Sequence, residues 1–431
     1  MGRSMNNIFV LVFFMGTFTG GYGQEKNSPG ALPNENIIYR PDIKTVQLYK
    51  EGFELSNPVI TLNTSERLKL SFDDLESGNK AYKFTILHCE SDWTTSSELT
   101  PFDYIEGYRE ENINDYSYSY NTTVNYTHYS VTFPTSTFRP KISGNYMILV
   151  YEDDPSDVVF TWRFMVAESS GIGIGGKVSQ ASRMDMRDIG QQIDFTIDLN
   201  SFAVSNMRQD IKVVVRQNER WDNALRNIEP RFIRGQSLDF SYDENNVFSG
   251  GNEFRVFDTK SLLYQSERVA RILYDTTYHV YLLGERPRTS KNYTYEKDLN
   301  GRFYIKNDEN VQNSNIESDY AWVHFFLPIP AMIGNGHLYI LGGLTNWKLD
   351  QTGRMNYNLQ RRGYELSLFL KQGLYNYLIV FVENGKTVGE ETLIEGSHWE
   401  TENEYTIFVY YREPGGLYDR LIAFQDISSA Q

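Results

Sequence analysis

Few residues in this chain are spaced in a way that supports chemistry. No G-x-S-x-G nucleophile motif occurs, and the one cysteine, Cys89, is followed by no thiol-enzyme signature. The six histidines stand far apart and form no H-E-x-x-H or other short ligand pair: His88, His128, His279, His324, His337 and His398. We therefore predict no catalytic residue and no metal site, and we expect the protein not to be an enzyme.

One glycine-rich stretch has the spacing of a nucleotide-binding motif. Gly171, Gly173 and Gly176 match G-x-G-x-x-G literally. A dinucleotide site needs these glycines to open a helix, because the helix N-terminus receives the pyrophosphate. Here a polar stretch and then a strand pattern follow instead. The motif therefore indicates an inter-domain linker, and no cofactor is expected.

The hexapeptide "LTNWKL", residues 344–349, offers one candidate binding residue. An Asn-Trp pair between strand patterns resembles the start of starch- and glycogen-binding modules of the early-set type, in which the Trp can stack on a sugar ring. In those modules a second aromatic residue commonly follows the Asn-Gly turn, but Lys386, Thr387 and Val388 follow it here. Trp347 is therefore a candidate partner contact first and a glycan contact second.

The N-terminus and the composition indicate a periplasmic protein. Arg3, a short apolar run and small residues predict a signal peptide over residues 1–23, with no Cys at the junction for a lipid anchor. Losing Arg3 makes the net charge of −15 one unit more negative, which disfavours nucleic acid and anionic membrane surfaces as partners. No later stretch approaches roughly 18 apolar residues, so we expect no direct membrane insertion.

Period-two alternation dominates the patterned parts of the chain. In "QQIDFTIDLN" apolar residues occupy every second position from Ile193 to Leu199, with polar residues between them. Residues 364–370 and 405–411 repeat the pattern, and no segment sustains helical spacing over three turns. The sequence predicts an all-β protein of tandem immunoglobulin-like or early-set β-sandwich domains.

Tyrosines concentrate in "NDYSYSYNTTVNYTHYSVTFP". Tyr116, Tyr118 and Tyr120 share one strand face, and the apolar phase shifts between Tyr126 and Tyr129. Two interpretations remain open: the rings cover a sandwich core, or they form an exposed aromatic face for a partner. The core interpretation is favoured, because alternation alone cannot show which face is exposed to water.

Composition shifts divide the mature chain. We predict an N-terminal β-sandwich over residues 24–167, a Gly/Ser linker over 168–178, a middle β-sandwich over 179–316 and a C-terminal early-set-like sandwich over 317–431. The second boundary falls in the polar stretch that precedes "YAWVHFFL".

Several long blocks, in order along nearly the whole mature chain, resemble one family. They include "YRPDIKTVQLY", "SGNYMILVYEDD", "QNERWDNA", "NVFSGGNEFRVFDTKSLLYQSERV" and "GSHWETENEYTIFVYYREPGG". The blocks are similar to those of the plug protein family of the type IX secretion system. The resemblance implies a non-enzymatic periplasmic protein, peripherally associated with the outer membrane, that binds the periplasmic mouth of the giant outer-membrane β-barrel translocon and seals its pore. The alternative is a periplasmic glycan-binding protein that uses the C-terminal sandwich around Trp347.

Overall fold

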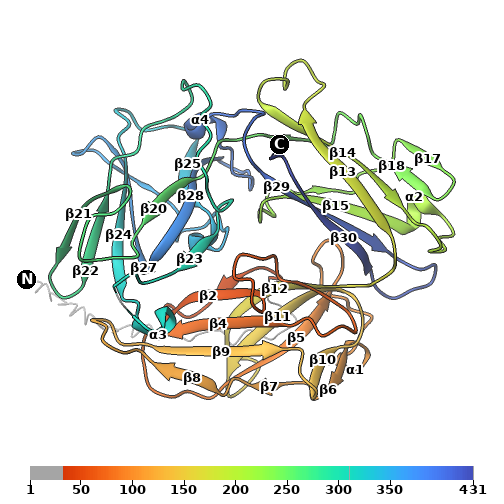
Figure 1. Ribbon diagram of the computed structural model, residues 1–431, viewed down its shortest axis with the longest axis horizontal. Coiled ribbons are helices and arrows are strands. Elements are labelled where there is room, and N and C mark those ends of the chain that lie inside the picture. Colours follow the sequence, from red (N-terminus) through yellow and green to blue (C-terminus); the bar gives the residue numbers. More distant parts are fainter. Residues whose placement is uncertain (1–32, 310, 431) are drawn as a thin grey trace, which may run out of the picture.

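The computed structural model describes residues 33–309 and 311–430, and its regular structure is almost entirely β-strand. The strands form sheets that pack in pairs, in three lobes around a common centre (Figure 1). The predicted all-β class and sandwich architecture are therefore confirmed. The predicted signal peptide, residues 1–23, lies outside the described residues. Among those described, no helix has the length and apolar character needed to cross a membrane.

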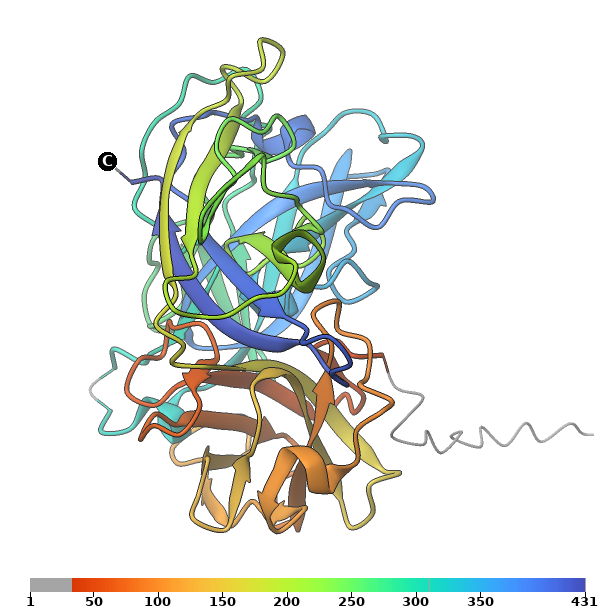
Figure 2. The ribbon, with the colours of Figure 1, turned by 90° about the vertical axis from the view of Figure 1, so that its right-hand side faces the viewer.

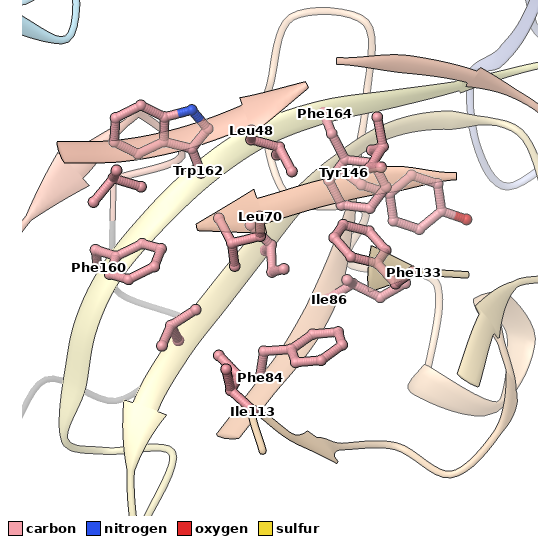
Figure 3. Packing of buried hydrophobic residues seen from close by; sticks show 14 of the residues in the cluster. Leu48, Leu70, Phe84, Ile86, Ile113, Phe133, Tyr146, Phe160, Trp162 and Phe164 are labelled. Carbon is pink, nitrogen blue, oxygen red and sulfur yellow. The ribbon is translucent and has the colours of Figure 1, made fainter. Parts of the chain in front are cut away.

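The N-terminal lobe contains the first twelve strands and one short helix. Its elements are β1 (Ile37–Ile38), β2 (Ile43–Lys50), β3 (Val59–Thr61), β4 (Leu68–Asp74), β5 (Tyr82–Cys89), α1 (Pro101–Tyr104), β6 (Ile105–Gly107), β7 (Glu111–Asn112), β8 (Asp115–Tyr118), β9 (Thr127–Phe133), β10 (Phe138–Pro140), β11 (Gly144–Glu152) and β12 (Val158–Ala167). The sheet β2-β4-β9-β8 packs against the sheet built on β12, β11 and β5. Side chains from both sheets, including Leu48, Leu70 and Phe84, fill one apolar core (Figure 3).

A second lobe, which we call the discontinuous lobe, uses two separate parts of the chain. Its elements are β13 (Gly173–Gln180), β14 (Gly190–Asp198), α2 (Met207–Asp210), β15 (Ile211–Gln217), β16 (Leu225–Arg226), β17 (Phe232–Arg234), β18 (Ser237–Asp239), β19 (Val247–Ser249), β29 (Glu404–Tyr411) and β30 (Arg420–Ser428). β29 pairs antiparallel with β15 from Ile211↔Tyr411 to Gln217↔Tyr405. The alternation predicted from Ile193 to Leu199 is confirmed in β14, whose apolar residues lie in the core of this lobe.

The third lobe, which we call the inserted lobe, lies between those two parts. Its elements are β20 (Arg255–Asp258), β21 (Val269–Tyr274), β22 (Tyr278–Leu282), β23 (Phe303–Ile305), α3 (Ser314–Glu317), β24 (Tyr320–Leu327), β25 (Gly336–Leu341), the 3-10 helix η2 (Gly343–Thr345), β26 (Asn356–Asn358), β27 (Gly363–Lys371), β28 (Gly373–Glu383) and α4 (Thr392–Glu395). The order β21-β22-β24-β27-β26 defines one sheet, and β28 pairs with β20, β23 and β25 in the other. Residues of both sheets share one core.

The two strand patterns in "YELSLFLKQGLYNYLIVFVENG" follow each other directly in the sequence but do not form a hairpin. β27 pairs with β24 and β26, whereas β28 pairs with β20, β23 and β25, so the two consecutive strands lie in different sheets. The turn around Gly373 is tight, because a Cβ atom there would lie 2.5 Å from the carbonyl oxygen of Tyr304. The connection is therefore an arch across the core. Strand patterns alone do not distinguish an arch from a hairpin.

The buried clusters group the strands differently from the predicted segments. The stretch 168–178, expected to be a linker, contains the start of β13, which pairs with β14 over its whole length. The last two strands, predicted within the C-terminal sandwich, share the core of residues 193–248. In Figure 1, β29 and β30 lie beside β15, away from β28. Long-range return of a strand leaves no signal in local alternation, because each partner shows the same period.

The lobes contact one another through buried surfaces. β29 is buried on both faces: Tyr405, Ile407 and Val409 face its own lobe, while Phe408 and Tyr410 join a cluster with residues of the N-terminal lobe such as Met147. Figure 2 shows the N-terminal lobe below the other two. Every residue from 405 to 411 is therefore buried.

Candidate functional site

A cavity of about 610 Å³ lies where the three lobes meet, and it is the candidate site. Strands β2 and β12 contribute Tyr49 and Trp162, the loop after β15 contributes Trp221, and the inserted lobe contributes Phe303 and Trp347. A volume between about 300 and 1,000 Å³ is typical of small-molecule sites, which favour the junctions of domains. The cavity exists only in the assembled chain, because each lobe supplies part of its wall.

Trp347, the candidate residue from the sequence, lies in this wall and is partly buried. It follows η2 in a left-handed turn, with φ values of 54° at Asn346 and 59° at Trp347. The indole Nε1–H donates to Oε2 of Glu219 at 3.1 Å, and the ring meets Phe254 edge to face at 6.0 Å. A Cβ atom at Gly301 would lie 2.2 Å from the indole. The indole is thus held by contacts within the protein, including one that joins two lobes.

Three acidic side chains that line the cavity are paired with cations. Oε1 of Glu219 accepts from Nε of Arg302 at 3.0 Å, which links the discontinuous and inserted lobes. Glu35 of the N-terminal segment pairs with Lys348 beside Trp347. Asp222 pairs with Arg220 at 2.8 Å. Each of these carboxylates therefore faces a cation, and the pairs of Glu219 and Glu35 also link two lobes.

Three arginines of the cavity wall surround Trp221 and have no such partner. The Cζ atoms of Arg163, Arg216 and Arg226 lie 5.4, 4.9 and 5.4 Å from the centre of the indole. Within the part of the chain that the structure describes, no carboxylate oxygen lies within 4 Å of their nitrogens. Burial lowers the pKa of Arg163 to about 10; the charge of Glu35 opposes the shift, and Arg226 and Arg216 add to it.

No pattern in the sequence indicates this arginine cluster. Arg163 comes from β12, Arg216 from β15 and Arg226 from β16, and each stands alone in a strand pattern. Only the packing of the N-terminal lobe against the discontinuous lobe brings them to one indole. Trp347 and the arginines line the same cavity, but their spacing in the sequence does not reveal it.

The histidines that the sequence scatters mostly remain apart. His88 is buried between Ser96 and the carbonyl of Ser143, and His128 contacts Asp73. His279 and His324 do meet, with ring nitrogens 3.0 Å apart on the neighbouring strands β22 and β24. Burial raises the pKa of the Cys89 thiol to about 12, which keeps it protonated near neutral pH.

One group of carboxylates has the spacing of a cation site. Ligand oxygens of Asp42, Asp74 and Glu76 lie within 4.8 Å of one another. The ammonium group of Lys80 lies 2.9 Å from Asp74 and 2.6 Å from Glu76, so a side chain already supplies positive charge there.

Gly173 and Gly176 of the glycine motif lie in β13 rather than at the start of a helix.

For three tyrosines of the tyrosine-rich stretch, the favoured core interpretation is wrong. Tyr116, Tyr118 and Tyr120 are 38%, 55% and 70% exposed, whereas Tyr126 and Tyr129, on either side of the phase shift, are buried. β8 is the edge strand of its sheet, and only Tyr116 of the three contacts the buried Tyr129, at 5.9 Å between ring centres. The first three tyrosines are therefore exposed, whereas Tyr126 and Tyr129 fit the core interpretation.

This chain resembles known proteins both in sequence and in structure. A family model for the first domain of type 9 secretion system plug proteins matches residues 43–168. The crystal structure of a hypothetical protein from Parabacteroides merdae is 35% identical, over 91% of this chain and 99% of its own, with a TM-score of 0.88. The C-terminal domain of the Streptococcus pyogenes protein AspA is 7% identical over 89% of this chain and 99% of that one, with a TM-score of 0.16. No curated protein matches.

Fold and site together define a class of protein: sandwich lobes joined by buried contacts, with an exposed aromatic edge and a polar cavity at their junction. The chain belongs to the family of type IX secretion system plug proteins. This family is a family of secretion plug domains and is not a known class of enzyme.

Proposed function

We propose that the protein is a non-enzymatic plug subunit that binds the periplasmic mouth of the giant outer-membrane β-barrel translocon of the type IX secretion system and seals its pore. Family membership carries the proposal. The protein acts in the periplasm, associates peripherally with the outer membrane through the translocon, and needs no cofactor.

The contacts between lobes support a role as an obstruction. A plug must resist deformation while it fills a wide opening, and bodies that are tied together by buried contacts resist relative motion better than bodies on flexible linkers. Asp73 of the N-terminal lobe pairs with Lys371 of the inserted lobe, and Ser91 donates to Asp419 of the discontinuous lobe at 2.7 Å. Arg302 then joins the inserted lobe to Glu404 at 2.8 Å. Every pair of lobes is thus connected.

The tyrosine edge of β8 is a suitable contact for the translocon. Tyr118, at the end of the edge strand β8, and Tyr120, two residues after it, are exposed in the domain that the family model matches. Tyrosine contributes strongly to interfaces, since its ring buries a large apolar area while its hydroxyl stays paired or wet. A releasable seal should bury more than about 1,200 Å² and use a few such anchors.

Copurification tests the proposal. The tagged chain, recovered from gently solubilised outer membranes of its own organism, should bring down a very large outer-membrane barrel in roughly equal amount. Cells that lack the protein should admit larger hydrophilic antibiotics. If no large barrel copurifies under any mild detergent, the proposal is incorrect.

A matched pair of variants tests the contact surface separately. Tyr118→Ser together with Tyr120→Ser should reduce recovery of the barrel, while Tyr264→Ser, an equally exposed tyrosine of the inserted lobe, should not. Equal recovery with both variants would exclude the β8 edge and leave the plug function intact.

A further inference from the structure

The arginine cluster of the central cavity lacks direct ion pairs, although the charges of Glu219, Asp426 and Glu404 favour the charged form of Arg216 from a distance. Arg163, Arg216 and Arg226 surround Trp221, and among the described residues none of the three has an ion-pair partner. Unpaired buried charges are costly, since desolvation is not repaid by a counter-charge. A bound anion would supply the counter-charge that these three arginines lack.

Arg216 is the most deeply placed of the three. Its side chain is 2% exposed, its Nη2 donates to Oδ1 of Asn57 at 2.6 Å, and its Nε–H has no hydrogen-bond partner. Buried donors are normally satisfied, so an unpaired guanidinium N–H in a cavity wall calls for an acceptor. The carboxylates of Glu404 and Asp426 approach this arginine through Asn57, whose amide nitrogen lies 3.2 and 3.3 Å from them.

The other two arginines are held by neutral groups. Nε of Arg163 donates to the carbonyl of Asn34 at 2.8 Å, and Nη1 of Arg226 donates to the carbonyl of Ser91 at 3.4 Å. Each interaction fixes the direction of the guanidinium and leaves its net charge in place. Three acidic groups of the same wall, Glu35, Glu219 and Asp222, are paired with other cations as described above. Glu54 and Asp350 also line the cavity.

We propose that the cavity binds an oxyanion, the phosphate or carboxylate group of a small ligand, among Arg163, Arg216 and Arg226. Planar guanidinium groups match the paired oxygens of both anions and bind them with charge-assisted hydrogen bonds. Around this point the wall is aromatic, with Trp162, Tyr49 and Trp221, so the rest of the ligand meets ring faces. This binding does not depend on the plug function.

Calorimetric titration of the purified chain with inorganic phosphate and, separately, with citrate at constant ionic strength tests the proposal. Saturable binding at one site is expected for at least one of them. The double variant Arg163→Gln, Arg226→Gln should bind that anion about tenfold or more weakly, because two charged donors are lost. The tighter anion identifies whether the ligand carries a phosphate or a carboxylate.

Arg234→Gln is the matched control. Arg234 also lies over an aromatic ring, 5.5 Å from the centre of Phe232, but it is exposed and outside the cavity. The Arg234→Gln variant should bind the anion with wild-type affinity. Absence of saturable binding to both anions, or equal affinity in the double variant, would overturn the proposal.

Footprinting of the wild-type chain gives a second measurement if the double variant fails to fold. p-Hydroxyphenylglyoxal modifies accessible guanidinium groups, and mass spectrometry locates the modified residues. Saturating anion should slow the modification of Arg163 and Arg226 and leave that of Arg234 unchanged. Equal rates with and without anion would also contradict the proposal.

Discussion

Nζ of Lys371 lies 2.5 Å from Oδ2 of Asp73, although the two residues are 298 positions apart and both side chains are 1% exposed. The same carboxylate accepts from the hydroxyl of Tyr320 at 2.6 Å and contacts Nδ1 of His128 at 2.6 Å. The ammonium group also faces the ring of Tyr126 at 4.1 Å. This cluster joins the inserted lobe to the N-terminal lobe, so it determines how two walls of the central cavity are placed.

Replacing Lys371 should strongly destabilise the fold. Lys371→Met removes the cation and leaves Asp73 buried with its hydrogen bonds but without its charge partner. Losing one member of a buried ion pair typically costs about 3 to 5 kcal/mol. We expect a clear fall in the thermal unfolding midpoint. Asp73→Asn combined with Lys371→Met should cost less than the sum of the two single changes, because the residues are coupled.

The control for this prediction is an exposed pair. Lys386 lies 2.5 Å from Glu383 at a surface turn, and its side chain is 68% exposed. Lys386→Met should leave the unfolding midpoint unchanged, since solvent screens such pairs. Equal effects of Lys371→Met and Lys386→Met would show that the interlobe pair does not stabilise the assembled chain.

Trp347→Ala should lower the free energy of unfolding, and we expect neither the wild type nor the variant to bind polysaccharides. The change removes the hydrogen bond to Glu219 and the contact with Phe254. A loss of about 1 to 3 kcal/mol is expected for such a partly buried site. Trp322→Ala, at an exposed tryptophan of the same lobe, should cost less. If affinity electrophoresis shows wild-type chain retarded by a soluble glucan and Trp347→Ala not retarded, the glycan-binding alternative is supported instead.

Local patterns predicted the strands well, while the lobes depend on pairings that local patterns do not record. The alternation from Ile193 to Leu199 identified β14 and its buried face, and the 405–411 pattern identified β29. Nothing in either pattern shows that β29 pairs with β15, because period two only assigns faces. The same holds for the candidate site. The motif "LTNWKL" identified Trp347, whereas Arg163 and Arg216 come together only through tertiary packing, which local patterns do not predict.

Glu253 should make the protein less stable as pH rises from about 4.5 to 7. Its side chain is 1% exposed, and burial raises the pKa of Glu253 to about 7, although hydrogen bonds from Tyr293 and from the Glu402 amide oppose the shift. The unfolded chain releases this proton near pH 4.5, whereas the folded chain holds it until about pH 7. Stability is therefore lost between about pH 4.5 and pH 7, by up to about 3 kcal/mol.

Glu253→Gln, which imitates the protonated acid, tests this prediction. The variant should unfold at a higher temperature than the wild type at pH 8 and at nearly the same temperature at pH 5. Glu400→Gln, at an exposed glutamate nearby, should not reproduce the difference. A stability difference that stays constant from pH 5 to pH 8 would show that the carboxyl does not titrate in that window.

His88 should act in the opposite direction, at acid pH. The imidazole is buried in the N-terminal lobe, next to Ser96 and the carbonyl of Ser143, and burial lowers the pKa of His88 to about 4. Because the unfolded chain protonates near pH 6.5, the native state loses stability as pH falls from 6.5 towards 4. The loss is about 3 kcal/mol at most.

NMR of histidine-labelled protein checks this directly, with His88→Gln used for assignment. The His88 resonance should stay constant from pH 7.5 to pH 5 and shift only near pH 4, and the fall in stability below pH 6.5 should be shallower in the variant. A titration midpoint close to 6.5 would mean that water reaches the imidazole. It would then show that the packing between His88 and Tyr146, whose ring centres are 5.0 Å apart, opens in solution.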